Sequence, residues 1–203
     1  MAAMNRVFLR LTSASVFILA GVLFWHEYSG DQKNGEVKEN ILAAPHLGPL
    51  RAITPPQVLP KFRFVDRAGE EHTLADFRGK MLLVNIWATW CPPCREEMPS
   101  LDRLQSQIGS DDFYVLTIST DLNGISTVQD FFWLNGITSL EAYADFNGET
   151  ENALKVPGLP TTLLIDKKGD AIGVMVGPTE WDSEEIIAVI SAQLSPEVKL
   201  ENR

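Results

Sequence analysis

The chain contains two cysteines, Cys91 and Cys94, and both lie in one short motif. The motif follows the apolar run Met81–Trp87 and precedes a segment, Arg95–Ile108, whose pattern predicts a helix. A thiol at a helix N-terminus faces unpaired backbone N–H groups and the positive end of the helix dipole, which favour the thiolate. A thiolate attacks a disulfide through a mixed-disulfide intermediate, which a second cysteine one helical turn away can resolve. The spacing therefore predicts a dithiol redox site, with Cys91 as the nucleophile and Cys94 as the resolving residue.

Two other uses of paired cysteines fit the sequence less well. A structural zinc site usually needs a full set of nitrogen or sulfur ligands, but the chain has no third cysteine and its histidines, His26, His46 and His72, are scattered. A permanent structural disulfide between Cys91 and Cys94 would close a very small loop, and the chain-entropy model gives small loops less stabilisation. We therefore expect a redox pair and no bound metal or other cofactor.

The residues around the cysteines are expected to shape the site and to contact the substrate. Pro92 and Pro93 have no backbone N–H, so the amide of Cys94 is the nearest donor left for the Cys91 thiolate. Trp90 is expected at the rim, where an aromatic ring covers the site. The simpler alternatives are that Pro92 is only a favourable first residue of a helix and that Trp90 belongs to the core. On the functional interpretation, Trp90, Pro92 and Pro93 form part of the substrate-binding surface.

Glu97 is the candidate proton acceptor. It follows Cys94 by three residues, which places both side chains on the same face of the predicted helix. A carboxylate in that position can take the proton of Cys94 when the mixed disulfide is resolved. The alternative is that Glu96 and Glu97 are solvated acids at a helix start, where the dipole favours them.

Three separated motifs carry a family resemblance, in the order in which the family has them. They are Leu83–Pro99, Val156–Asp166 and Gly177–Asp182. Together they resemble the membrane-anchored, extracytoplasmic TlpA/ResA-like branch of the thioredoxin superfamily, and the third motif is most similar to its TlpA members. The resemblance covers about residues 55 to 196. It implies an α/β, thioredoxin-like fold, a central mixed sheet flanked by helices, with an N-terminal β-hairpin and a central insertion between Asp121 and Pro160.

The resemblance also assigns roles to single residues. It implies that the Leu159–Pro160 peptide bond is cis and that the backbone of Leu159 lies open beside the cysteines, where a partner chain can pair with it. It supports the rim position of Trp90 and the role of Glu97. Cytosolic thioredoxins carry a buried aspartate where this chain has Asn85, and an asparagine cannot act as a base.

The N-terminal sequence predicts an export signal that stays in the membrane. Arg6 and Arg10 precede an apolar stretch without an evident cleavage site, and the positive-inside rule then places the redox domain outside the cytoplasm. A cleaved signal peptide is the alternative. The expected segments are a cytoplasmic N-terminus (1–10), a single transmembrane signal anchor (11–28), a flexible linker (29–55), the thioredoxin-like domain (56–196) and a C-terminal tail (197–203). We therefore expect a bacterial inner-membrane protein with a periplasmic domain.

The remaining pattern predicts the elements of an alternating α/β domain. The expected strands are Phe62–Val65 and Glu71–Leu74, which form the hairpin, then Met81–Trp87, Phe113–Ser119, Leu140–Ala144, Thr161–Ile165 and Ile172–Val176. The expected helices are Ala75–Phe77, Arg95–Ile108, Thr127–Asn135, Glu149–Lys155 and Ser183–Leu194. The formal net charge of −10 argues against nucleic acid as a partner.

Two functional classes are compatible with these observations. The first is a thiol:disulfide oxidoreductase that reduces disulfides in extracytoplasmic proteins; the resemblance suggests copper-delivery proteins for cytochrome oxidase assembly, or apocytochromes c, and an upstream membrane thiol donor. The second is a copper carrier of the thioredoxin fold that resembles the Sco-like proteins. That branch spaces its cysteines by three residues and adds a distant histidine, whereas here the spacing is two and no histidine follows His72. The first class is favoured.

Overall fold

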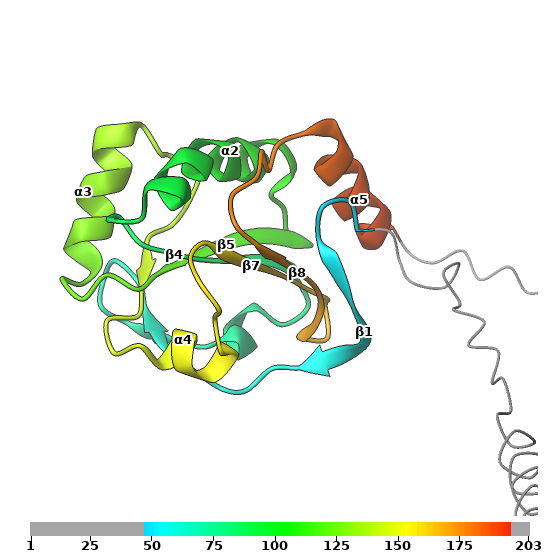
Figure 1. Ribbon diagram of the computed structural model, residues 1–203, viewed down its shortest axis with the longest axis horizontal. Helices are drawn as coiled ribbons and strands as arrows, with labels where there is room; N and C mark the ends of the chain where they lie inside the picture. Colours follow the sequence, from blue (N-terminus) through cyan, green and yellow to red (C-terminus); the bar gives the residue numbers. More distant parts are fainter. Residues whose placement is uncertain (1–46, 196–203) are drawn as a thin grey trace, which may run out of the picture. The chain divides into compact units, whose positions relative to one another are not determined.

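The computed structural model describes residues 47–195, which are built around an eight-stranded mixed sheet (Figure 1). The strands are β1 (Arg51–Val58), β2 (Phe64–Val65), β3 (Glu71–His72), β4 (Met81–Trp87), β5 (Phe113–Ser119), β6 (Tyr143–Ala144), β7 (Thr161–Ile165) and β8 (Asp170–Val176). They lie side by side in the order β1-β8-β7-β4-β5-β6-β2-β3. The central strand β4 is parallel to β5 on one side and antiparallel to β7 on the other.

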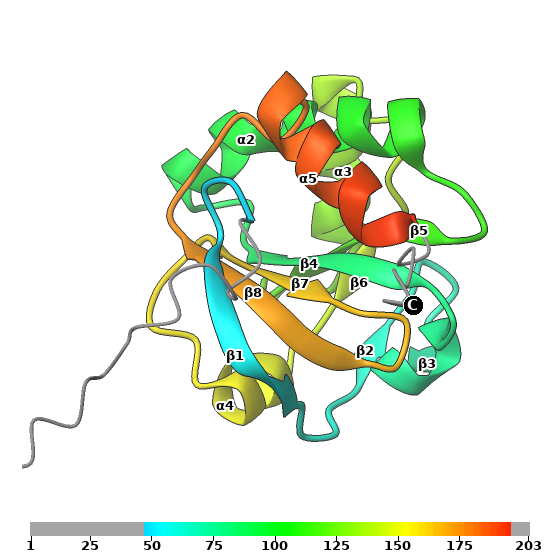
Figure 2. The ribbon, with the colours of Figure 1, turned by 90° about the vertical axis from the view of Figure 1, so that its right-hand side faces the viewer.

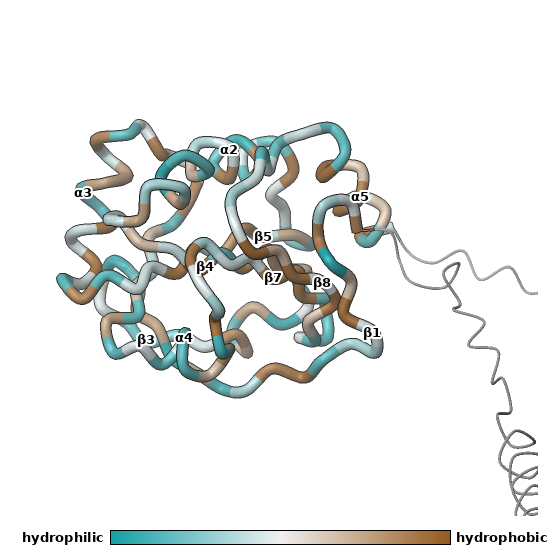
Figure 3. Tube along the Cα trace, in the orientation of Figure 1, coloured by the Kyte–Doolittle hydropathy of each residue, from teal (hydrophilic) through white to brown (hydrophobic). Residues whose placement is uncertain are grey.

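Helices cover both faces of this sheet. They are the 3₁₀ helix η1 (Leu74–Phe77) and the α-helices α2 (Pro92–Ile108), α3 (Ile125–Asn135), α4 (Glu149–Leu154) and α5 (Glu184–Leu194). Helices α2, α3 and α5 lie on one face, and α4 and η1 lie on the other (Figure 2). Because successive strand side chains point to opposite faces, Leu83 joins the core under α2 and α5, whereas Val84 joins the core on the α4 side. Strand β4 is buried throughout, which explains its continuous apolar sequence. Hydrophobic segments also mark the neighbouring central strands β5, β7 and β8 (Figure 3).

The register of the central strands brings three chain segments to one edge of the sheet. Trp87 at the end of β4 pairs with Ser119 at the end of β5, so the loops that follow both strands start side by side. Thr161 at the start of β7 pairs with Ile86 near the end of β4. The cysteine motif, the segment after β5 and the Leu159–Pro160 segment therefore converge.

The expected hairpin and insertion are present. Strands β2 and β3 pair in an antiparallel hairpin, and β2 also pairs with β6, so the hairpin extends the sheet. The region between Asp121 and Pro160 contributes α3, β6 and α4. Helix α2 begins at Pro92 rather than at the predicted Arg95, because proline fits the first turn of a helix without loss of a hydrogen bond.

The expected start of the domain at residue 56 differs from the structure. Residues assigned to the end of the linker form β1, which pairs antiparallel with β8, for example Arg51 with Val174. Leu47 and Leu50 are buried in the core under α5. The prolines of this segment exclude a helix, but an edge strand with an irregular register tolerates them. The folded domain therefore includes residues from 47 onward.

Several predicted segments fall outside the described residues. These are the cytoplasmic N-terminus (1–10), the signal anchor (11–28), most of the linker (29–46) and the C-terminal tail (197–203). Between residues 47 and 195, no helix combines the length and the apolar character that crossing a membrane requires.

Candidate functional site

Cys91 and Cys94 form a disulfide at the N-terminus of α2. Cys91 is the N-cap residue, and the amide of Cys94 donates to Cys91 Sγ at 3.3 Å, as the two intervening prolines predict. A nucleophilic Cys91 at the start of the helix would be expected to expose its sulfur, but the residue is only 4 % exposed and Cys94 is 0 % exposed. The bond to Cys94 draws the Cys91 sulfur toward the first turn of α2. Cys91 remains the more accessible of the two.

An exposed apolar rim borders the disulfide. Trp90 is 67 % exposed, which excludes a core role and is consistent with the expected position at the rim. Pro92 is exposed and Pro93 is half-buried at the start of α2. Leu122, in the segment after β5, is 83 % exposed. The rim of Trp90 and Leu122 offers apolar surface on the two loops that start side by side at the ends of β4 and β5.

A buried carboxylate ties these two loops together. Asp121 is 2 % exposed and accepts hydrogen bonds from the amide of Thr89 at 2.8 Å and from its hydroxyl at 2.7 Å. It also accepts from the hydroxyl of Ser119 at 2.6 Å. Asp121 therefore fixes the segment that carries Trp90 and Cys91. Sequence reasoning missed it, although an acid directly after a parallel strand beside β4 is a usable signal.

Glu97 lies in the core rather than in solvent. It is 2 % exposed, whereas its neighbour Glu96 is exposed, so the alternative of a solvated helix-start acid is wrong for Glu97. Burial raises the pKa of Glu97 to about 7, because the charged form is poorly solvated there. Its hydrogen-bond donors lower the pKa and only partly offset the effect of burial. A carboxyl group with a pKa near 7 can both accept and release a proton at neutral pH.

Three donors from two segments distant in the chain hold the Glu97 carboxylate. The amide nitrogen of Asn85 on β4 donates to Oε1 at 2.7 Å. The indole Nε1 of Trp181 donates to Oε2 at 2.8 Å, and the backbone amide of Thr179 donates to the same oxygen at 3.2 Å. Because helix α2, strand β4 and the segment before α5 all contribute, the carboxylate keeps its place one helical turn after Cys94.

Asn85 links Glu97 to the start of β7. It is 0 % exposed, and its amide nitrogen also donates to the hydroxyl of Thr162 at 2.9 Å. Within residues 47–195, the Asn85 amide oxygen has no hydrogen-bond partner. Asn85 thus acts as a neutral donor that orients the acid, in agreement with the expectation that it cannot itself be the base.

Sequence reasoning identified the motif that contains Trp181 without giving the residue a role. Trp181 is 0 % exposed, and its backbone amide is fixed by the hydroxyl of Ser100 at 3.1 Å. The contact between Trp181 and Glu97 joins residues far apart in the chain, so no local sequence pattern predicts it. A tryptophan inside a polar turn motif is the one available signal.

The Leu159–Pro160 bond is cis, as the resemblance implies. Pro160 is buried and Leu159 is half-buried at the entry to β7. The carbonyl of Pro160 accepts from the amide of Gly177 at 2.9 Å, and the Thr161 hydroxyl donates to the carbonyl of Gly158 at 2.6 Å. The segment is therefore fixed at both ends beside the end of β4, and the contact of Leu159 with a partner chain stays a prediction.

No residue cluster in the described part of the chain has the composition of a metal site. Among residues 47–195, no three histidine, cysteine, aspartate or glutamate side chains come together in a way that would hold a metal ion. His72 contacts Asp66 through Nε2 at 3.1 Å. Cys91, Cys94 and the buried carboxyl of Glu97 give the site a cysteine pair and an acid on one helix.

Comparison with known proteins agrees with this geometry. The Redoxin family model matches residues 56–190. The chain is 36 % identical over 118 residues to the thiol-disulfide oxidoreductase ResA of Geobacillus kaustophilus, covering 58 % of this chain and 67 % of that protein. It is 31 % identical over 129 residues to the thioredoxin-like protein YneN of Bacillus subtilis, covering 60 % of this chain and 71 % of that protein.

Solved structures match over most of their length. A putative thiol:disulfide interchange protein DsbE from Chlorobium tepidum aligns with a TM-score of 0.60 and 26 % identity, covering 69 % of this chain and 97 % of that one. A DsbF homologue from Corynebacterium diphtheriae aligns with a TM-score of 0.58 and 27 % identity, covering 73 % and 95 %. These matches confirm the TlpA/ResA-like resemblance and the thioredoxin-like fold. The chain belongs to the Redoxin family and is a thiol–disulfide oxidoreductase.

Proposed function

We propose that the protein is an extracytoplasmic reductant that transfers two electrons from its dithiol to disulfides of partner proteins. The observation that carries the proposal is the placement of Glu97, buried and held by three donors, one helical turn after Cys94. A general base near Cys94 can take the proton of this thiol when the mixed disulfide is resolved. This is the step that releases the partner protein in its reduced form. The Cys91–Cys94 disulfide of the structure is the product of that reaction.

The first step is attack by Cys91. Its thiolate, which accepts the amide of Cys94, forms a bond to one sulfur of the partner disulfide. The partner's S–S bond breaks, and its second sulfur leaves as a thiolate that takes a proton from water. The positive end of α2 favours the Cys91 thiolate before the attack. Cys91 and one partner cysteine are then joined in a mixed disulfide.

The second step is resolution by Cys94. Glu97 accepts the proton of the Cys94 thiol, and the resulting thiolate attacks Cys91 Sγ. The bond between Cys91 and the partner breaks, and the partner's remaining sulfur leaves with the electron pair and is protonated. The partner gains two electrons and two protons, and the Cys91–Cys94 disulfide forms. A carboxyl with a pKa of about 7 is close to the value that proton transfer at neutral pH requires.

The sequence and the resemblance support the proposed cellular setting and partner. The basic and apolar N-terminal pattern at Arg6, Arg10 and residues 11–28 supports an inner-membrane anchor with a periplasmic redox domain. The TlpA/ResA-like resemblance supports copper-delivery proteins for cytochrome oxidase assembly, or apocytochromes c, as the partners. A membrane thiol donor would return Cys91 and Cys94 to the reduced state.

Trapping the mixed disulfide tests the proposal. In cells that express full-length Cys94→Ser, Cys91 attacks but cannot be released, so covalent adducts with periplasmic partners accumulate and are identified by mass spectrometry. The Cys91→Ser variant forms no adduct and reduces no disulfide. Adducts with cytoplasmic proteins alone would refute the proposed location, and labelling of Cys94 before Cys91 by sub-stoichiometric alkylation of the reduced protein would reverse the assigned roles.

A further inference from the structure

A second surface of the molecule has the shape of a binding site. Two grooves, of about 570 and 350 Å³, lie on either side of Leu59 and Pro60, which line both. The larger groove runs between β1, β8 and α4, and the smaller one between residues 58–62, η1 and the turn from β7 to β8. Both α4 and η1 lie on the face of the sheet opposite α2 and α5 (Figure 2). We call this surface the basic grooves, for the charges described below.

The walls of the basic grooves are largely apolar. Ile53, Leu163 and Val174 line the larger groove. Val58, which is 78 % exposed, and Leu74 line the smaller one. Concave apolar surface of this kind accepts individual side chains of a ligand.

Most cations of the described residues that take part in no ion pair line these grooves. Within residues 47–195, the lysines and arginines that take part in no ion pair of 4.0 Å or less are Arg51, Lys61, Arg78, Arg95, Lys155 and Lys168. All of them except Arg95 line the grooves, and Asp170 is the one carboxylate that lines either groove. The whole chain carries a formal net charge of −10, so this concentration of unpaired positive charge runs against its composition.

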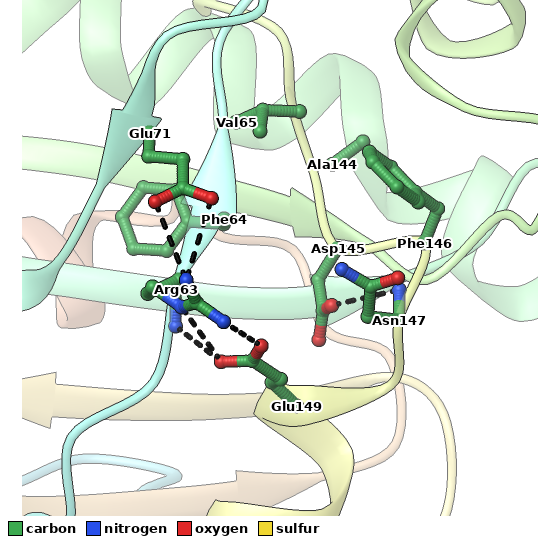
Figure 4. Close-up of a pocket in the computed structure, with 9 residues that line it drawn as sticks. All are labelled: Arg63, Phe64, Val65, Glu71, Ala144, Asp145, Phe146, Asn147 and Glu149. Atoms are coloured by element: carbon green, nitrogen blue, oxygen red, sulfur yellow. Dashed lines mark hydrogen bonds and ion pairs between the residues drawn. The ribbon is translucent and has the colours of Figure 1, made fainter.

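Arg63, which lies near these grooves, is a cation whose charge is paired within the protein. Arg63 lies in a separate small pocket, where Glu149 contacts it at 2.8 Å and Glu71 at 3.4 Å (Figure 4). These carboxylates neutralise its charge. The cations of the basic grooves have no such carboxylates, so their charge is available to a ligand.

We propose that the basic grooves dock an acidic segment of a partner protein, with apolar side chains in the two grooves and carboxylates against the surrounding lysines and arginines. Charge complementarity selects an anionic partner and steers its approach. The separated concave grooves fit side chains of a peptide better than the flat surface of a membrane. The proposal rests on the proposed function only in taking this partner to be the redox substrate.

The larger groove adjoins the redox site along the chain. Lys155 and Val156 line it on one side of the cis-proline segment, and Thr161 lines it on the other. Thr161 pairs with Ile86, at the end of β4 that leads to the cysteine motif. A segment docked in the larger groove therefore holds its protein next to Leu159 and Pro160, and raises the effective concentration of its disulfide at Cys91.

Peptide binding to the full-length, oxidised protein tests the proposal without redox chemistry. The probe is a fluorescent twelve-residue peptide without cysteine that alternates glutamate or aspartate with leucine and phenylalanine, followed by fluorescence anisotropy. We expect saturable binding that weakens as salt is raised. The double variants Arg51→Glu/Lys155→Glu and Lys61→Glu/Lys168→Glu should each weaken it about tenfold.

The controls separate this result from misfolding and from a failure of the redox assignment. Arg67→Glu reverses an exposed cation that lies outside the grooves and contacts Glu141 at 3.9 Å, and it should leave binding within about twofold. Each variant should keep the wild-type urea midpoint, which shows that the fold is intact, and should still exchange with a small disulfide probe, which shows that the cysteines are intact. Equal binding of a peptide with lysines in place of its acids, no effect of the double variants, or binding only to phosphatidylglycerol vesicles would overturn the proposal and leave the exchange activity in place.

Discussion

Two buried carboxylates flank the redox disulfide, and the structure gives them different surroundings. Glu97 and Asp121 are each 2 % exposed, and each accepts three hydrogen bonds. The donors to Asp121 come from Thr89, on the loop after β4, and from Ser119, the last residue of β5. The donors to Glu97 come from strand β4 and from the segment before α5, both distant in the chain, and the carboxylate lies one helical turn after Cys94.

Two acids that are equally buried can therefore act on the redox site in different ways. Asp121 accepts hydrogen bonds from the backbone amide and the hydroxyl of Thr89. It therefore affects the reactivity of Cys91 only through the position of the loop that carries this residue. Glu97 bonds to groups whose own positions are fixed elsewhere, and burial raises its pKa to about 7. We therefore propose a positioning role for Asp121 and proton transfer for Glu97.

The largest expected effect concerns stability as a function of pH. The pKa of Glu97 rises from 4.5 to about 7 on folding, so between these values the folded protein holds a proton that the unfolded chain has released. The free energy of unfolding therefore falls as pH rises through this window, by at most about 3 kcal/mol. Glu97→Gln should lose this slope, as measured by urea unfolding of the oxidised protein from pH 4 to 8.

The Gln side chain fits the same hydrogen bonds in one orientation. The oxygen of the new Gln side chain accepts hydrogen bonds from Trp181 and Thr179. If the Asn85 amide group rotates by half a turn, the Gln amide can donate to the Asn85 oxygen, which has no partner in the described structure. Glu96→Gln, the exposed neighbour, is the matched control and should keep the wild-type slope. A slope shared by all three proteins would mean that Glu97 titrates as a solvated acid.

The next effect is on the resolution of the mixed disulfide. Glu97→Gln should slow this step about tenfold to a hundredfold at pH 6 to 7, the lower part of the range for general acid–base catalysis, and should spare the attack by Cys91. The defect should fade toward pH of about 8.5, where a free thiol ionises unaided. Single-turnover kinetics separates the two steps. Asp121→Asn should change the rates of both steps by similar small factors. A selective effect of Asp121→Asn on resolution would contradict the positioning role of this residue.

A smaller effect is expected on stability when the positioning acid is changed. Asp121→Asn keeps the shape but replaces hydrogen bonds to a charged acceptor by neutral ones, which should cost about 1–2 kcal/mol of unfolding free energy. Chemical denaturation at pH 7 measures it. The matched control is Asp145→Asn, a 3 % exposed acid that caps the turn before α4, bonded to the amides of Asn147 and Thr150. Both should destabilise, but only Asp121→Asn should also alter the reactivity of Cys91.

The parts of this site that follow local rules could be predicted from the sequence. The cysteine pair and Glu97 lie within two turns of one helix, so their spacing alone places them on a common face. The apolar run of β4 likewise fixes the strand that precedes them, because a strand buried on both faces must be apolar throughout.

The parts that depend on contacts across the sheet could not be predicted. Trp181 reaches Glu97 across 84 positions of the chain, and Asp121 reaches Thr89 across 32. Strand β1 could not be predicted because its prolines suggest a linker. Prolines exclude a helix, but an irregular edge strand tolerates them. The low exposure of Cys91 depends on its bond to Cys94 and on the packing around α2, which the spacing of the two cysteines does not show.

The smallest expected effect concerns the indole that holds Glu97. Trp181→Phe removes the Nε1 donor but leaves the Asn85 and Thr179 donors in place. Because a hydrogen bond to a carboxylate favours its charged form, its loss should raise the pKa of Glu97 further above 7, by about half a unit to one unit. Carbon-13 NMR of the Glu97 carboxyl in the oxidised protein measures this shift without interference from thiols. Trp133→Phe, on an 82 % exposed residue of α3, should leave the pKa unchanged. An unchanged pKa in Trp181→Phe would show that the indole only fills space, and Glu97 would then owe its orientation to Asn85 and Thr179 alone.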